Sequence, residues 1–198
     1  MKLTKEVICS TIFMQKKKLR RLKMYEELKQ YITDIPDFPS EGIIFHDITS
    51  IIQNGESFKL AIDALYDVIK DIDFDVIAGI ESRGFIFGAA LAAKLNKGLV
   101  LVRKKGKLPR ATVSEKYDLE YGQAEIEIHT DAIKEGQKVL VIDDLIATGG
   151  TVKAATKLIE RLGGEVAATA FLIELKELGG RAALEPYVVR TVMVYEGR

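Results

Sequence analysis

Residues 138–151 constrain the fold most, because they combine an apolar run, two acids and a small-residue loop. The apolar run leads to Asp143 and Asp144, and the chain then becomes small and hydroxylated up to Thr151. Residues 152–162 have the pattern of a helix. Small loop residues let backbone N–H groups approach an anion, and a helix N-terminus adds partial positive charge. This order therefore predicts a phosphate cradle at the carboxyl end of a strand, where open α/β sheets bind ligands.

The cradle belongs to neither of the two commonest nucleotide motifs. No Gly-Lys-Ser/Thr follows its first glycine at the P-loop spacing, and Gly-x-Gly-x-x-Gly is absent from the chain. The alternative is an ordinary βα turn that carries acidic residues.

Strands and helices are expected to alternate along the chain, which predicts an α/β fold with a parallel sheet and right-handed crossovers. Strands are expected at 75–80, 99–103, 138–142, 166–172 and 188–194, and helices at 24–32, 55–70, 85–95, 152–162 and 178–184. The continuous apolar run at 99–103 predicts a strand covered on both faces. Two prolines and a glycine give residues 34–42 an extended, turning path, and a short strand or ordered loop follows at 43–49.

Residues 104–130 predict a hairpin arm with a mobile tip. The segment starts with a basic stretch, and residues 125–129 then alternate strictly between polar and apolar. Such alternation is typical of a half-exposed strand, with Glu125, Glu127 and His129 facing outward. Loops of this length within compact domains are usually lids or disordered segments.

The charge of the chain is unevenly distributed. Of 29 basic and 29 acidic residues, eight basic residues and one acid fall in residues 1–23, which leaves 24–198 with a net charge of −7. An acidic body argues against nucleic-acid binding as the main function. The leader is expected to be a disordered extension or a start-site artefact, with Met24 as a plausible natural start and 24–198 as one domain. A basic arm for RNA or a membrane surface is the alternative.

The single cysteine, Cys9, excludes an intrachain disulfide, and one cysteine with two histidines cannot build a closed zinc site. No apolar run approaches the roughly eighteen residues of a membrane span. The basic cluster follows the apolar residues 7–14 instead of preceding them, which is wrong for a signal peptide. A cytoplasmic protein is therefore expected.

Several side chains near the expected strand ends are candidates for binding and catalysis. Asp143 and Asp144 point to opposite sides of their strand, so both cannot be core, and they could accept bonds from sugar hydroxyls or help place Mg²⁺. Arg83 could bind phosphate oxygens bidentately, or form a surface salt bridge. Glu120, in the expected lid, could exchange a proton with a base nitrogen, or belong to an exposed loop. A histidine such as His46, taken alone, is more often a structural or surface residue than a catalytic one.

A second group of cations is expected beside Arg83. Arg103, Lys104 and Lys107 follow the next strand, so that basic residues would surround one polyanionic ligand. A solvated run of charge is the alternative for this cluster.

Five segments together resemble the adenine phosphoribosyltransferases, a family of type I phosphoribosyltransferases, from about Met24 to the C-terminus. They are Asp37-Phe38-Pro39 with residues 42–45, Glu81-Ser82-Arg83-Gly84-Phe85, residues 103–109, residues 117–122 and residues 141–151. The resemblance implies a Rossmann-like parallel sheet flanked by helices, with a small N-terminal hood and a β-hairpin lid. It also implies a pentosyltransferase that converts adenine and phosphoribosyl diphosphate (PRPP) to AMP and diphosphate with Mg²⁺, as a homodimer.

The resemblance further implies a role for each matching residue. The 5′-phosphate would be held by Ala147, Thr148, Gly149, Gly150 and Thr151, and the ribose by Asp143 and Asp144. Arg83, Arg103, Lys104 and Lys107 would face the diphosphate, some of them from a partner subunit. The adenine pocket would include Ile44, Phe45 and His46, and catalysis would fall to Glu120 with Tyr121 beside it.

One position departs from the pattern, because the family commonly has arginine where this chain has His46. Histidine differs from arginine in donor geometry and charge, so the polar contact with the base is in question. A 6-oxopurine substrate is the first alternative, since His46 could donate to the oxo group. A PRPP-sensing regulator that binds nucleic acid through its leader is the second. The intact Glu120-Tyr121 pair and the shortness of the leader speak against it.

Overall fold

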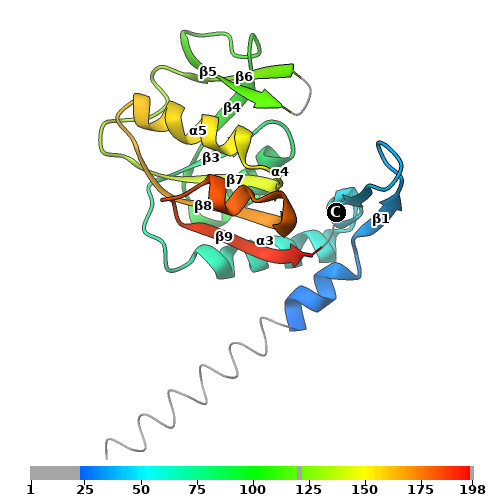
Figure 1. Cartoon of the computed structure of the whole chain (residues 1–198). Helices are drawn as coiled ribbons and strands as arrows, with labels where there is room; N and C mark the ends of the chain where they lie inside the picture. The colour runs from blue at the N-terminus through cyan, green and yellow to red at the C-terminus, as the bar shows by residue number, and fades with distance from the viewer. Residues whose placement is uncertain (1–22, 120–121, 197–198) are drawn as a thin grey trace, which may run out of the picture. The chain divides into compact units, whose positions relative to one another are not determined.

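The computed structural model describes residues 23–119 and 122–196 and shows two compact units (Figure 1). The first unit ends at Ala64 and the second begins at Leu65, so the division falls within helix α3 (Gly55–Ile69). A single domain over 24–198 stays a prediction, and most of the basic leader lies outside the described residues.

The first unit corresponds to the predicted hood. A helix at 23–29 leads into strand β1 (Thr33–Pro36), which pairs antiparallel with β2 (Ile44–Asp47). Helix α2 (Thr49–Gln53) follows and was not predicted from the sequence. Asp47 accepts bonds from the backbone N–H and the hydroxyl of Thr49, which explains why the chain turns into a helix there.

The second unit is built on a seven-stranded sheet in the order β5-β6-β4-β3-β7-β8-β9. Its five consecutive strands from β4 to β9 run parallel, and the pair β5–β6 joins β4 antiparallel. The parallel strands are β3 (Val76–Ile80), β4 (Gly98–Lys104), β7 (Lys138–Ile146), β8 (Glu165–Leu175) and β9 (Val189–Tyr195). The predicted α/β fold with a largely parallel sheet is therefore confirmed.

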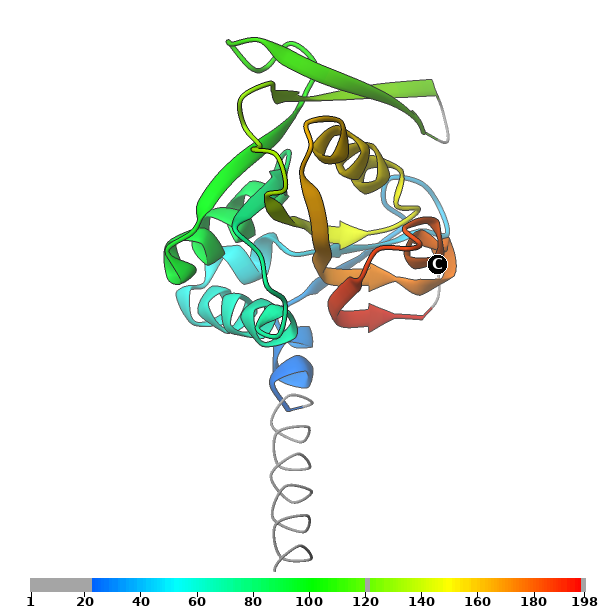
Figure 2. The ribbon, with the colours of Figure 1, turned by 90° about the vertical axis from the view of Figure 1, so that its left-hand side faces the viewer.

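Helices α4 (Arg83–Leu95) and α5 (Gly150–Arg161) cover opposite faces of this sheet (Figure 2). Residues of α5 share a buried cluster with Val139 and Val141, whereas Gly88 of α4 lies against Ile142. Successive residues of a strand face opposite sides, so the two helices enclose β7 between them. The carboxyl end of β7 is thereby held at a fixed place between two packed layers.

Strand β4 corrects one prediction. Val100 and Val102 are buried, but Leu101 between them is 37% exposed. Cover on both faces was therefore wrong for this strand. The apolar run reflects one buried face and one face that is only partly covered, since Leu99 on it lies against Gly88 of α4 whereas Leu101 is exposed.

The hairpin is confirmed, with β5 (Thr112–Leu119) paired antiparallel to β6 (Gly122–His129). The predicted alternation holds for the apolar face, where Ile126 and Ile128 are buried, but the polar face is less exposed than predicted. Glu127 is only 2% exposed, because its carboxylate accepts hydrogen bonds from the loop before β5. His129 is half-buried, and its Nδ1 is buried with no hydrogen-bond partner among the described residues. The predicted mobile tip at 120–121 lies outside the described residues.

The hairpin lies beside α5 in both views of the ribbon (Figures 1 and 2). Lys157 of α5 donates to Glu115 at 3.0 Å, and Arg161 donates to the carbonyl of Ser114 at 2.8 Å. The helix predicted at 178–184 is shorter in the structure, where a 3₁₀ turn at Lys176–Leu178 is followed by α6 at Gly180–Ala183. No helix within the described ranges is both long and apolar enough to cross a bilayer.

Candidate active site

The loop between β7 and α5 forms the predicted cradle. Gly149 adopts a φ of +82°, which favours glycine, and turns the chain into the first residue of α5, Gly150. The first N–H groups of a helix have no partner within it and carry partial positive charge. A hollow of about 110 Å³ lies over them, lined by Asp143, Leu145, Ile146, Ala147, Thr148, Gly149, Gly150, Thr151 and Val152. All five predicted phosphate-binding residues therefore line one hollow.

The two acids at the end of β7 have different surroundings. Asp144 is 6% exposed, and its Oδ2 accepts a bond from Nε of Arg83 at 2.5 Å. Asp143 accepts the backbone N–H of Asp144 at 2.9 Å. Burial and then the negative charge of Asp144 raise the pKa of Asp143 well above its usual range. Asp143 therefore keeps its proton more readily than an exposed carboxylate would.

A second hollow of about 310 Å³ adjoins these acids. It is lined by Glu81, Ser82, Arg83, Lys104, Tyr117, Asp143, Asp144, Leu145 and Thr151. The ends of β3, β4 and β7 and a residue of the hairpin strand β5 thus meet at one place. Two predicted cations, Arg83 and Lys104, line this hollow beside the two predicted ribose ligands.

The other two predicted cations are not among the lining residues of either hollow, within the part of the chain described. Arg103 donates from Nε to Oε2 of Glu81 at 3.1 Å and from Nη1 to the carbonyl of Lys107 at 2.9 Å. The backbone N–H of Lys104 donates to the same Glu81 oxygen at 3.0 Å. Burial acts to raise the pKa of Glu81, but these bonds outweigh it and hold the pKa below its usual value. Arg103 and Glu81 therefore shape the basic loop.

Gly84 brings α4 against the acids. A Cβ at this position would lie 2.7 Å from the carbonyl oxygen of Ile142 and 2.9 Å from Oδ1 of Asp143. Only a residue without a side chain lets the first turn of α4 approach β7 so closely. Arg83 in that turn then reaches Asp144.

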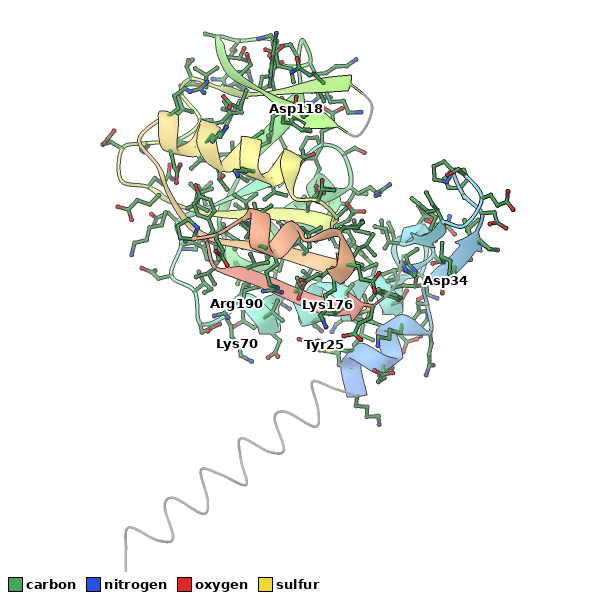
Figure 3. The ribbon with its side chains drawn as sticks, viewed as in Figure 1. Tyr25, Asp34, Lys70, Asp118, Lys176 and Arg190 are labelled. Carbon is green, nitrogen blue, oxygen red and sulfur yellow. The ribbon has the colours of Figure 1, made fainter. Side chains whose placement is uncertain are left out.

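The predicted base-binding residues lie in the hood. Ile44 is 45% exposed, and the ring of Phe45 meets that of Phe38 edge to face at 5.3 Å between centroids. Nδ1 of His46 lies 2.6 Å from Oδ1 of Asp34, which Figure 3 labels. An acid therefore stands next to the position where the family commonly has arginine.

The predicted catalytic residues, Glu120 and Tyr121, lie outside the described residues. The neighbouring part of the hairpin is described: Asp118, labelled in Figure 3, accepts a bond from Gln123 at 3.0 Å. A Cβ on Gly150 would lie 3.5 Å from the carbonyl oxygen of Asp118. The strand that leads to Glu120 thus passes beside the phosphate cradle.

The sequence did not single out Tyr117 as a site residue, nor Glu81 and Glu127 as supports of the basic loop. Tyr117 and Glu81 stood within motifs of the resemblance, which was the available signal. Glu127 stood in a strand whose alternation indicated exposure. No cluster of three or more histidine, cysteine or acidic side chains that could hold a metal is found among residues 23–119 and 122–196.

Residues 47–193 match the model of the phosphoribosyl transferase domain family. The adenine phosphoribosyltransferase of Lachnoclostridium phytofermentans is 56% identical over 173 residues, which are 87% of this chain and 99% of that one. That of Butyrivibrio fibrisolvens is 59% identical over 173 residues, or 87% and 96% of the two chains.

Solved structures give the same result. The crystal structure of adenine phosphoribosyltransferase from Thermoanaerobacter pseudethanolicus has a TM-score of 0.84 and 48% identity, and covers 86% of this chain and 99% of that one. The Saccharomyces cerevisiae enzyme, crystallised with adenine and an imino-altritol bisphosphate, has a TM-score of 0.82 and 41% identity over 87% and 99% of the two chains.

Proposed function

We propose how this chain binds its substrates in the two hollows described above. The chain belongs to the phosphoribosyl transferase family and within it to the adenine phosphoribosyltransferases. The reaction joins adenine to PRPP, releases diphosphate and yields AMP, as a step of purine salvage. The observation that carries the proposal is the hollow over residues 147–151, with a second hollow directly beside it that brings two cations, Arg83 and Lys104, together with Asp143 and Asp144.

The cradle from Ala147 to Thr151 binds the 5′-phosphate of PRPP. Its backbone N–H groups and the N-terminus of α5 supply donors and positive potential without a lysine. The hydroxyls of Thr148 and Thr151 line the same hollow and can donate further bonds.

Asp143 and Asp144 bind the ribose hydroxyls. Both carboxylates line the hollow next to the cradle, where a sugar linked to the bound phosphate would lie. The Arg83 guanidinium holds Asp144 in place. A diol that donates to Asp143 would stabilise its charged form, which burial disfavours.

Arg83 and Lys104 face the diphosphate, and Arg103 and Lys107 support the loop that presents Lys104. Positive groups that are already in position when the reaction starts stabilise the negative charge that develops on the leaving diphosphate. In the reaction the C1′–oxygen bond to diphosphate breaks and a bond from C1′ to the purine nitrogen forms.

We further propose that Ile44, Phe45 and His46 line the adenine pocket. Ile44 and Phe45 offer apolar surface for a planar base, and His46 offers a polar edge. Glu120 takes the proton that the purine nitrogen loses, with Tyr121 beside it. The hairpin that carries them excludes water, which would otherwise hydrolyse PRPP.

The acidic residues present fit Mg²⁺ bound mainly through the substrate. Mg²⁺ keeps several waters and phosphate oxygens and needs only one or two protein carboxylates. Asp143 is the candidate, because Asp144 is paired with Arg83. When bound, Mg²⁺ neutralises charge on the diphosphate.

A homodimer in the cytoplasm completes the proposal. The second unit exposes large apolar side chains on α3, α4 and β4, namely Tyr66, Ile86 and Leu101, which a second copy could cover. The single cysteine suits a reducing compartment.

The test is an assay of the full chain with PRPP and Mg²⁺ and one of four bases: adenine, hypoxanthine, guanine or xanthine. We expect AMP from adenine and little nucleotide from the 6-oxopurines. Thr148→Ala should raise the KM for PRPP. Absence of AMP would refute the activity, and wild-type kinetics in Thr148→Ala would refute the assignment of the cradle.

A further inference from the structure

The phosphate loop rests on a second backbone segment that lies far from it in the sequence. A Cβ on Gly180, the first residue of α6, would overlap the carbonyl oxygen of Ala147 and lie 2.7 Å from Cγ1 of Ile146. A Cβ on Gly149 would in turn lie 3.0 Å from the carbonyl oxygen of Gly180. The two glycines therefore let the loop and the start of α6 touch through their backbones.

Helix α6 cannot hold this position by itself, because a helix of four residues has almost no stability of its own. Arg181 fixes it to the sheet. Its Nε donates to Oε1 of Glu174 at 2.9 Å, and its Nη1 donates to the carbonyl of Val189 at 2.9 Å. Its Nη2 donates to the hydroxyl of Thr191 at 3.1 Å.

Glu174 anchors this network under the loop. It is 5% exposed and pairs in the β7–β8 register with Ile146, the last residue before the phosphate loop. The hydroxyl of Thr191 donates to its Oε2 at 3.0 Å. The bidentate pair with Arg181 has a fixed geometry, so it sets where Gly180 meets Ala147.

We propose that Gly180, Arg181 and Glu174 form a brace that positions the phosphate loop for the 5′-phosphate of PRPP. They are positioning residues, because the brace touches the loop from the side of α6 and acts through the backbone at Ala147 and Gly149. An anion site made of backbone N–H groups needs those groups held in one arrangement before the ligand arrives. The brace supplies that rigidity, and the inference rests on the proposed function of the loop.

The experiment compares Gly180→Ala with Gly179→Asn in the full chain. Both sites lie at the start of α6, but nothing lies within 4 Å of a Cβ at Gly179, whose φ of +72° asparagine tolerates. Ribose 5-phosphate binding is measured by calorimetry, and the KM values for PRPP and adenine by steady-state kinetics. Arg181→Lys is added because lysine keeps the charge but loses the planar fork.

We expect Gly180→Ala to weaken ribose 5-phosphate binding by about tenfold to a hundredfold, the effect of an ångström-scale displacement in a preorganised site. The KM for PRPP should rise much more than the KM for adenine, and Arg181→Lys should show a smaller change in the same direction. Gly179→Asn should behave as wild type. Circular dichroism checks that each variant is folded.

Equal affinity for ribose 5-phosphate in wild type, Gly180→Ala and Arg181→Lys would overturn the brace. So would an equal loss in all three variants, Gly179→Asn included, because that would indicate a general effect on folding. If Gly180→Ala does not fold, Arg181→Lys alone decides. Failure of the wild type to bind ribose 5-phosphate would instead refute the proposed function of the loop, which keeps the two failures apart.

Discussion

Glu127 is the buried carboxylate that holds the basic loop, and its removal should open that loop before the protein unfolds. Its Oε1 accepts the backbone N–H groups of Lys107 at 3.0 Å and Leu108 at 2.9 Å. Its Oε2 accepts the hydroxyl of Thr112 at 3.1 Å, and Nζ of Lys105 lies 3.8 Å away. With 2% exposure, water cannot replace these bonds without a structural change.

The expected loss in the free energy of unfolding follows from the hydrogen-bonding groups that each substitution leaves without a partner. Glu127→Ala removes the acceptor of two backbone N–H groups, whereas the Thr112 hydroxyl can rotate to another partner. Hydrogen bonds to a charged group contribute about 1.5–3 kcal/mol each, so we expect a loss of about 3–5 kcal/mol in the free energy of unfolding. Glu127→Gln keeps one oxygen for both N–H groups and should cost about 1–2 kcal/mol.

The effect depends on pH with a definite sign. Burial acts to raise the pKa of Glu127, but the bonds from Leu108, Thr112 and Lys107 outweigh it and lower the pKa. A carboxyl group with a lowered pKa in the folded state stabilises the fold above its ordinary pKa, and this stabilisation is lost as pH falls through the folded-state value. Wild type and Glu127→Gln should therefore differ at neutral pH and converge in acid.

The assay is native-state hydrogen exchange at the amides of Lys107 and Leu108, together with urea unfolding. Glu125→Gln on the same strand is the matched control, because the Glu125 side chain is half-buried and its carboxylate lies 3.7 Å from Nζ of Lys105. Its bond to the loop backbone is made by its own carbonyl, which accepts the N–H of Lys105 at 3.0 Å and which the substitution keeps. We expect faster exchange at both amides in Glu127→Ala, a raised KM for PRPP, and near wild-type behaviour in the control. Unchanged protection of the two amides would refute the reasoning.

Three further predictions concern Asp143, the close approach at Gly84 and the lid residue Glu120. Asp143→Asn should raise the melting temperature at pH 8 but not in acid, and should weaken ribose 5-phosphate binding. Because the pKa of Asp143 is raised, the stabilisation from its protonated form is lost as pH rises through the folded-state pKa. An amide at this position does not ionise, so the variant avoids that loss. A lower melting temperature of the variant at pH 8 would contradict this. Gly84→Ala should cost about 1–3 kcal/mol in urea unfolding and raise the KM for PRPP, since its Cβ would meet the carbonyl of Ile142 at 2.7 Å. Glu120→Gln should lower kcat more than it raises the KM for PRPP, and the reverse pattern would place Glu120 in substrate binding.

The order of strands and helices and the hollowed loop between β7 and α5 were predictable because their signals are local. The run of 138–151 contains the strand, the acids and the loop within fourteen consecutive positions, and the helix period of the next residues fixes where α5 lies. Arg83 was also correctly expected to lie beside Asp143 and Asp144, because the carboxyl ends of parallel strands meet at one edge.

The supports of the site were not predictable, because each joins residues distant in the sequence. Glu127 follows the alternation of an exposed strand, yet the loop at 107–108 folds over it and buries it. Nothing in the sequence indicated that Gly180 contacts the phosphate loop, because it is only the second of two glycines near the start of a helix. Its contact with Ala147 depends on the packing of three strand ends, which no local pattern specifies.

The supporting glutamates are consistent with the proposal that an acidic body binds a polyanion. Residues 24–198 carry a net charge of −7, which by itself would repel PRPP. Glu81, Glu127 and Glu174 are each bound to backbone N–H groups, a hydroxyl or an arginine, and the pKa of each is lowered by those bonds. Their negative charge is therefore compensated within the protein, at the places where it orders a loop. In the proposed binding mode, the backbone N–H groups of residues 147–151 and the side chains of Arg83 and Lys104 meet the phosphate groups. Asp143 and Asp144, which line the same hollows, are left for the ribose hydroxyls.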